Sequence, residues 1–153
     1  RTNYYWHNSE WVYKDIKPRI ICEKYLEAED GNPPKDYKVF CFNGEPKIIE
    51  VDSNRFTSHT RNFYDTEWNF IELTNNKKPN NADQLDEKHS CLNELLYLSR
   101  QLSCSFPHVR VDFYIVEGKL IFGELTFWHA SGMGEFQPEE FEIIMGNWLK
   151  LPK

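Results

Sequence analysis

Two acidic residues stand in a stretch that otherwise has the pattern of two apolar strands around a glycine turn, VRVDFYIVEGKLIFGELTFWHASG, residues 109–132. An ionised carboxylate among apolar groups is unfavourable unless a cation or hydrogen-bond donors pair with it. Asp112 and Glu124 therefore need a partner. Carboxylate oxygens suit Mg²⁺, which usually takes one or two protein carboxylates besides phosphate and water. The nearby Arg110 suits a phosphate, because its guanidinium can bind two phosphate oxygens at once.

The turn of this hairpin decides whether the two acids share a face, because a shift of one residue turns every side chain over. A two-residue turn at 117–118 would put Asp112 and Glu124 on opposite faces. A three-residue loop at 116–118 would place Arg110 opposite Glu124 and make Asp112 its diagonal neighbour. The longer loop also buries the apolar side chains of both strands together, so we expect the three-residue loop.

The polar face of the hairpin has two interpretations from the residues alone. Arg110 can form a salt-bridge cluster with Asp112 and Glu124 on a solvated sheet face. Alternatively, the two carboxylates converge on a metal ion, because like charges repel unless a cation lies between them or one stays protonated. Thr126 lies on the same face. The spacing leaves both interpretations open.

The flanking elements predict an α+β fold, an antiparallel β-sheet with helices packed on one face. Asn43-Gly44 is typical of a two-residue turn between strands at 36–42 and 46–51. The segment 80–106 has an apolar stripe of helical period, with acids expected in the first turn of the helix. The stripe comprises Leu85, Leu92, Leu95, Leu96 and Leu102, and the acids are Asp86 and Glu87. We also expect a strand at 18–27, an extended segment with a covering loop at 52–78, and a short helix from Pro138.

Composition is typical of a globular chain with one core. The chain has 153 residues, 40% of them hydrophobic, and no apolar run long enough for a membrane span. A net charge of -6 and a pI of about 5.4 argue against a binder of nucleic acids or anionic membranes. The four cysteines have neither a C-x-x-C pair nor zinc-like spacing with histidines, which favours buried, reduced thiols. We therefore expect a cytoplasmic protein without a nucleic-acid partner.

The same residues resemble the ATP-grasp superfamily. RVDFYIVEGKLIFGELTF, residues 110–127, is similar to the metal-binding hairpin of that superfamily, and CEKYLE, residues 22–27, to the hinge that holds adenine. DYKVFCFNGEPKII, NFYDTEWNF and FGELTFWHASGMGEF resemble the TupA-like ATP-grasp group, which is associated with teichuronopeptide and capsular polysaccharide synthesis. The resemblance runs from about residue 4 to residue 152 and implies the C-terminal lobe of an ATP-grasp fold.

This resemblance implies roles for individual positions. Asp112 and Glu124 would be Mg²⁺ ligands, with Thr126 where many relatives have an asparagine that completes the metal shell. Arg110 would contact phosphate. The adenine hinge would comprise Glu23, Lys24, Tyr25 and Leu26, with Asp36 near the ribose and Lys38 near the phosphates or the adenine. Asn69 stands near where some relatives have a phosphate-binding lysine, so Arg55 or Arg61 would substitute for that lysine.

The implied activity joins a carboxylate to an amine through an acyl-phosphate, with ATP and Mg²⁺ as cofactors and a small molecule or glycan precursor as substrate. His129 and the loop 131–134 follow Glu124 closely and are candidates for lining the acceptor pocket. Residues 1–153 are expected to form a single partial domain whose partner is a missing N-terminal lobe of the same chain, which would carry a lysine and a glycine-rich phosphate loop. We therefore expect weak or no turnover from the 153-residue chain by itself.

Two other functions fit the residues. An ATP-dependent sugar phosphotransferase could use the same metal-binding face. A non-catalytic carbohydrate-binding module could instead use the aromatic side chains at 3–11 and 62–69 as stacking surfaces. Nucleotide binding separates the module from both enzymes, and the identity of the product separates the two enzymes.

Overall fold

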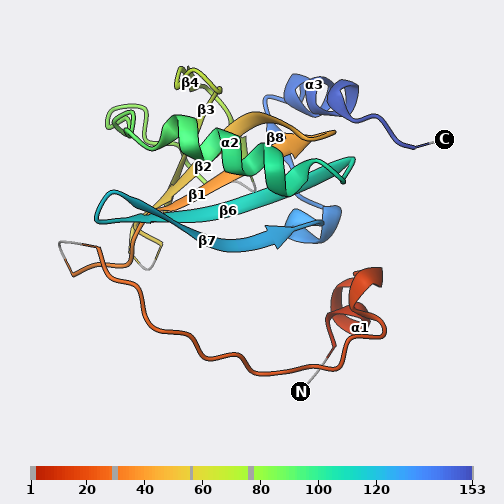
Figure 1. The fold of residues 1–153 in the computed structure, drawn as a ribbon. Helices are drawn as coiled ribbons and strands as arrows, with labels where there is room; N and C mark the ends of the chain where they lie inside the picture. Colours follow the sequence, from red (N-terminus) through yellow and green to blue (C-terminus); the bar gives the residue numbers. More distant parts are fainter. Residues whose placement is uncertain (1–2, 29–30, 56, 76–77, 153) are drawn as a thin grey trace.

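The computed structural model of the chain describes residues 3–28, 31–55, 57–75 and 78–152. A six-stranded antiparallel sheet with the order β4-β3-β2-β1-β6-β7 forms its centre, and β5 pairs with β8 in a second, small sheet (Figure 1). The elements are α1 (Tyr4–Asn8), β1 (Asp36–Phe42), β2 (Glu45–Ser53), β3 (Thr60–Tyr64), β4 (Phe70–Ile71), β5 (Thr74–Asn75), α2 (Leu92–Ser103), β6 (His108–Val116), β7 (Lys119–Thr126), β8 (Phe136–Gln137) and α3 (Glu140–Trp148), with 3₁₀ turns at Trp11–Tyr13 and His129–Gly132. The predicted α+β fold with an antiparallel sheet is confirmed.

The β1–β2 hairpin forms at the predicted Asn43-Gly44 turn. Both residues have positive φ, +51° and +80°, as a two-residue turn between twisted strands requires. Glycine is also needed for space, because a Cβ on Gly44 would lie 3.2 Å from the Cα of Cys104. This hairpin supplies the two central strands of the sheet that carry half of the polar face described below.

The helix α2 covers one face of the sheet. Its buried residues Leu92, Leu95 and Leu96 pack against alternate residues of the central strands. The strand residues in this cluster are Tyr37, Val39, Cys41, Ile49, Val51, Tyr64, Val109, Val111 and Phe113. Because residues alternate between faces in a strand, the intervening residues of β1, β2 and β6 point to the other side of the sheet.

The helix is shorter than the sequence predicts, and Leu85, Asp86 and Glu87 precede it. Asp86 is tied to β3 instead: its backbone N–H donates to the Tyr64 hydroxyl at 2.7 Å, and its carboxylate accepts from the same hydroxyl at 3.0 Å. The Trp68 indole N–H also donates to the Asp86 carbonyl at 3.0 Å. These tertiary hydrogen bonds override the local helical pattern, and the helix begins at Leu92.

The other face of the sheet is half aromatic and half charged. Phe40 and Phe63 form its buried aromatic part and pack with Phe136 of β8, and α3 adds Met145 and Phe141 to this cluster. Both helices were predicted to pack on one face, but α3 lies on the face opposite α2, because its apolar side continues the aromatic cluster. Within residues 3–28, 31–55, 57–75 and 78–152, no helix packs on the charged part of this face, which holds the site described below.

The segment at 18–27 is extended but is not a strand. None of the described residues pairs with it, and its β-branched side chains are exposed, Ile21 to 81%. A run of β-formers becomes a strand only where another strand supplies partners for its backbone. In Figure 1 the segment passes below β7 toward α1.

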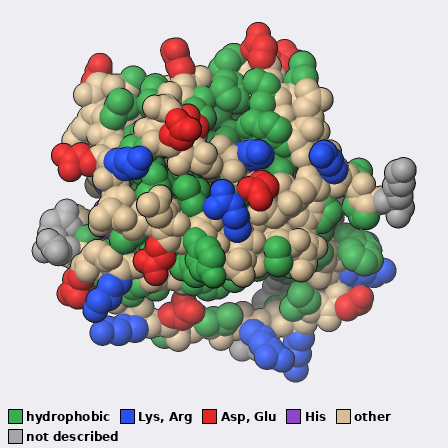
Figure 2. All heavy atoms as spheres, turned by 45° about the horizontal axis from the view of Figure 1, so that its top comes forward, with side chains coloured by type: hydrophobic (Ala, Val, Ile, Leu, Met, Phe, Trp, Pro, Cys, Tyr) green, Lys and Arg blue, Asp and Glu red, His purple; other side chains and the backbone are tan. Residues whose placement is uncertain are grey.

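The surface has mixed charge on the side that Figure 2 presents, where acidic and basic side chains are interspersed with apolar ones. All four cysteines are free thiols; Cys41 and Cys91 are buried, whereas Cys22 and Cys104 are exposed. Among the described residues, no helix is both long and apolar enough to cross a bilayer.

Candidate functional site

The β6–β7 hairpin brings Asp112 directly opposite Glu124. The predicted three-residue loop is wrong: the turn has two residues, Glu117 and Gly118, both with positive φ, and Val116 pairs with Lys119. A β-bulge at Gly123 corrects the register, because this extra residue shifts the rest of β7 by one position.

Gly123 is suited to the bulge because the neighbouring strand lies very close to it. A Cβ at this position would lie 3.1 Å from the backbone oxygen of Asp112 and 3.3 Å from the Tyr114 ring. Beyond the bulge, Thr126 lies opposite Arg110. Arg110, Asp112, Glu124 and Thr126 therefore share one face of the hairpin. A two-residue turn and a bulge produce this arrangement in place of the predicted three-residue loop.

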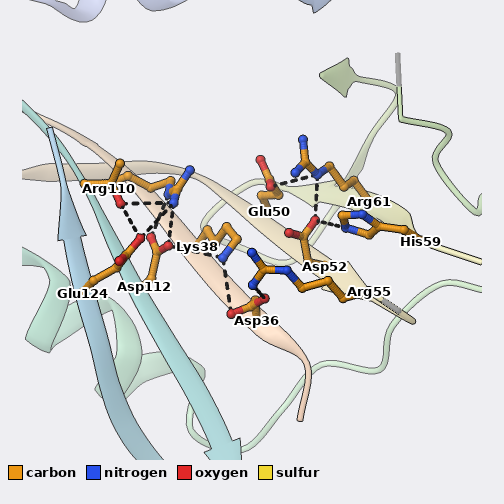
Figure 3. A network of polar contacts seen from close by, with 11 residues as sticks. Asp36, Lys38, Glu50, Asp52, Arg55, His59, Arg61, Arg110, Asp112 and Glu124 are labelled. Carbon is orange, nitrogen blue, oxygen red and sulfur yellow. Dashed lines mark hydrogen bonds and ion pairs between the residues drawn. The ribbon is translucent and has the colours of Figure 1, made fainter. Parts of the chain in front are cut away.

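Arg110 holds the two carboxylates together (Figure 3). Its Nε donates to Asp112 Oδ1 at 2.7 Å and its Nη2 to Asp112 Oδ2 at 2.6 Å. The same Nη2 lies 3.7 Å from Glu124 Oε1 and donates to the Thr126 hydroxyl at 3.1 Å. Burial is the largest single effect on the Arg110 guanidinium and lowers its pKa. The hydrogen bonds to Asp112 and the charges of Asp112, Glu50 and Glu124 together outweigh burial, so the pKa of Arg110 is raised. Two acids thus converge on one positively charged group.

Lys38 links the hairpin to the rest of the sheet. It is buried, pairs with Asp112 across β1 and β6, and pairs with Glu50 across β1 and β2. Its Nζ lies 3.2 Å from Asp112 Oδ2 and 3.3 Å from Asp36 Oδ1. Asp36 also accepts from Arg55 Nη1 at 3.2 Å. The residues that were predicted to contact the metal ion, the ribose and the phosphates therefore form one connected network of ion pairs.

Sequence reasoning missed Glu50 and Asp52, which continue the network on β2. Arg61 Nε lies 2.8 Å from Asp52 Oδ1 and 3.3 Å from Glu50 Oε1, and His59 Nε2 lies 3.1 Å from Asp52. The signal was present: in IIEVDS, acidic residues alternate with apolar ones, so both acids share a face with Lys38 of the preceding strand.

Glu50 is the most deeply buried acid of the network. It is 1% exposed, and no described group forms a hydrogen bond with its Oε2. Burial raises the pKa of Glu50 to about 7, against the lowering effect of Arg61. A carboxyl group with this pKa can take up or release a proton near neutral pH.

The network lines a pocket of about 630 Å³. The predicted hinge residues Glu23, Lys24 and Leu26 line it from the extended segment, and His129 and Ala130 line it from the loop after β7. Its charged lining residues are Glu23, Lys24, Asp36, Lys38, Glu50, Asp52, Arg55, Arg61, Arg110, Asp112 and Glu124. Thr126 is not among the lining residues, although it hydrogen-bonds to Arg110 and Glu124.

A second pocket of about 540 Å³ adjoins the first and shares Glu23, Lys24 and Leu26 with it. Tyr25 lines only this second pocket, together with Pro33 and other residues of the loop before β1. Three of the four predicted hinge residues therefore line both pockets, and the fourth lines only the second.

His129 is a neutral imidazole in this setting. Burial, followed by the charge of Arg110, lowers the pKa of His129 to about 4. The ring packs edge-on against Phe40 at 5.2 Å and lies 5.5 Å from the ring of Phe136. Asn69 lies away from these groups and donates its side-chain amide to Asp65 at 2.8 Å.

The protein family follows from a match over almost the whole sequence. Residues 1–150 match the model of a family described as TupA-like ATPgrasp. The chain belongs to the TupA-like ATP-grasp family. The predicted membership is confirmed, and it indicates an ATP-grasp type of ligase, a superfamily that typically uses ATP and Mg²⁺. No curated protein and no solved structure matches this TupA-like chain.

The site of this TupA-like chain offers few protein ligands for a metal ion, and this suits Mg²⁺. Among the described residues, no group of three or more His, Cys, Asp or Glu side chains could hold a metal ion. Mg²⁺ needs only one or two carboxylates when phosphate and water complete its shell. Asp112 and Glu124 provide two on facing strands, and the Glu124 side chain is 67% exposed. The fit requires Arg110 to release Asp112, whose two oxygens it now occupies.

Proposed function

We propose that this chain provides the Mg·ATP-binding face of a carboxylate–amine ligase. The ligase would act in the cytoplasm on a precursor of a cell-surface polysaccharide or teichuronopeptide. The observation that carries the proposal is the direct pairing of Asp112 with Glu124, both in the lining of the pocket that the hinge residues also line. Family membership supports the reaction type.

The nucleotide would extend from the hinge toward the hairpin. Its adenine would lie near Lys24 and Leu26, and its phosphates near Lys38, Arg55 and Arg110. Six acidic and five basic side chains line the first pocket, so the protein charges nearly cancel. A triphosphate therefore needs a divalent cation to enter, and Asp112 with Glu124 would hold that cation. Bound Mg²⁺ would neutralise phosphate charge.

The basic residues have a defined part in this proposal. Arg110 would exchange its carboxylate partner for a phosphate, because a guanidinium binds either group in the same two-point geometry. Lys38 is buried and lies between two acidic neighbours, so it would stay fixed in place. Arg55, which is more exposed, would be free to follow the substrate phosphates.

Calorimetric titration of the full-length protein with ATP, with and without Mg²⁺, tests this proposal. The double variant Asp112→Asn, Glu124→Gln is expected to lose Mg-dependent binding. The variant Asp83→Asn, Glu87→Gln makes the same chemical changes at exposed positions and should bind as the natural protein does.

The absence of Mg-dependent ATP binding by the natural protein would overturn the proposal. Mass spectrometry of the products then separates the two enzyme classes. An amide together with ADP and phosphate supports the ligase, whereas ADP with a phosphorylated sugar identifies a phosphotransferase.

A further inference from the structure

Three polar atoms lining the first pocket have no hydrogen-bond partner within the part of the chain that the structure describes. They are Glu50 Oε2, Asn75 Oδ1 and His129 Nε2. Glu50 is 1% exposed and Asn75 is 2% exposed. An unpaired polar atom in such a setting costs free energy, so native proteins usually pair it with protein, water or ligand.

These three residues surround the aromatic part of the face. Glu50 pairs with Phe63 across β2 and β3, and Asn75 pairs with Phe136 across β5 and β8. His129 contacts the ring of the same Phe136. The three unpaired atoms therefore come from three elements, β2, β5 and the loop after β7, whose residues neighbour the same aromatic cluster and line the same pocket.

Glu50 is separated from the β6–β7 hairpin that carries Asp112 and Glu124. In the row of paired residues across the sheet, Lys38 lies between Asp112 and Glu50. Figure 3 shows the same order, with Arg110, Asp112 and Glu124 on one side of Lys38 and Glu50 on the other. A group bound at Glu50 would thus share the pocket with the phosphates but would not replace them.

The chemistry of the three atoms selects a ligand that donates hydrogen bonds. The Glu50 carboxylate and the Asn75 amide oxygen are acceptors, and a neutral imidazole has one nitrogen that accepts. Arg61 and Arg110 influence the charge of both Glu50 and His129. Asp52 acts against them at Glu50 and Asp112 at His129, so the surroundings are close to neutral in charge. Only the uncharged form of an amine has the lone pair that can attack an acyl-phosphate, so the reactive ligand is the uncharged amine.

We propose that Glu50, Asn75 and His129 form the subsite that binds the uncharged primary amine of the acceptor substrate. This inference rests on the proposed ligase function and names where its nucleophile binds. A primary amine has two N–H groups, so two of the three acceptors would hold them at any one time, and the nitrogen lone pair would stay free to react.

The reaction step balances with these groups. The amine nitrogen attacks the carbonyl carbon of the acyl-phosphate, the C–N bond forms, and the bond from that carbon to the phosphate oxygen breaks. Inorganic phosphate leaves with the bonding electron pair. The proton lost by nitrogen can pass to the Glu50 carboxylate, whose raised pKa of about 7 suits this role.

Nuclear magnetic resonance of the full-length protein tests the subsite without knowledge of the natural acceptor. The probe is methoxyamine, which is uncharged at neutral pH and donates only through its N–H groups. The control ligand is N,N,O-trimethylhydroxylamine, which has no N–H. We expect methoxyamine to shift the His129 ring-nitrogen signals in a saturable manner and the trimethyl compound to leave them unchanged.

Variants give a second measurement. Glu50→Met and Asn75→Leu each remove one acceptor and are expected to weaken methoxyamine binding roughly tenfold. Glu72→Met is the matched change at an exposed position and should have no effect. Thermal unfolding establishes that each variant is folded, and the comparison of the two ligands on the natural protein needs no variant.

The outcomes distinguish this subsite from the proposed function. If the natural protein binds Mg·ATP but methoxyamine does not shift His129, the amine subsite is wrong and the nucleotide site stands. An equal shift by both ligands would also overturn the subsite. If Mg·ATP does not bind, the ligase proposal fails before the subsite is considered.

Discussion

Glu50→Gln is expected to stabilise the folded chain above neutral pH. Burial raises the pKa of Glu50 from 4.5 to about 7. Between these two pH values the folded protein keeps a proton that the unfolded chain releases, so the free energy of unfolding falls as pH rises. The amide has the shape of the protonated acid and does not ionise. At about 1.4 kcal/mol per tenfold change in proton affinity, the variant should gain roughly 3 kcal/mol at about pH 8 and almost nothing near pH 4.5.

Urea unfolding of both proteins at several pH values between about 4.5 and 8 measures this difference. Taking the variant minus the natural protein cancels the titration of all other groups, including His129. Arg61 keeps a partner in the variant, because Asp52 remains 2.8 Å from its Nε. Glu72→Gln, an exposed site, should show no pH-dependent gain. A difference that stays constant across this pH range, or a loss of stability at the alkaline end, would refute the reasoning.

Three further perturbations test other parts of the site. His129→Gln should make the folded chain less sensitive to acid. Burial lowers the pKa of His129 to about 4, so the natural protein loses stability as pH falls from 6.5 to 4. Urea unfolding should show that the variant loses roughly 2–3 kcal/mol less over this range. Gly123→Ala should destabilise the folded chain by roughly 1–3 kcal/mol in the same assay, because the added Cβ would lie 3.1 Å from the Asp112 backbone. A Cβ added at Gly146 in α3 would have no atom within 4 Å, so Gly146→Ala should stabilise the folded chain by about 1 kcal/mol. Lys38→Met should cost roughly 3 kcal/mol, since it leaves Asp36 and Asp112 each with one cation fewer. Lys119→Met, at an exposed position, is the control, and equal losses for the two variants would contradict this account.

The sequence predicted the parts of the fold that depend on the conformational preferences of adjacent residues. Asn43-Gly44 requires a two-residue turn between β-rich runs, and the turn forms there. The sequence also indicated that Arg110, Asp112 and Glu124 share a polar face, although through the wrong turn. The bulge was not predictable from alternation, because Gly123 fits a regular strand pattern as well as a bulged one.

Features that depend on distant contacts were missed. Asp86 looked like a first-turn helix residue, but hydrogen bonds to Tyr64 hold it outside the helix. Glu50 was overlooked because its depth follows from the strands on both sides of β2. The run at 18–27 has strand-forming residues, yet none of the described residues pairs with it. Site residues that stand out within their own strand were therefore predicted. Residues whose burial depends on the neighbouring strands were not.

The bulge at Gly123 also determines how the hairpin responds to the deletion of a residue from β7. It means that β7 holds one residue more than regular pairing with β6 requires. Deleting Gly123 would make Phe122 and Glu124 sequence neighbours, and neighbours in a regular strand point to opposite faces. Glu124 would still lie opposite Asp112. Loss of this residue is therefore expected to be milder than its replacement by a larger one, the reverse of the usual order for an amino acid inside a strand.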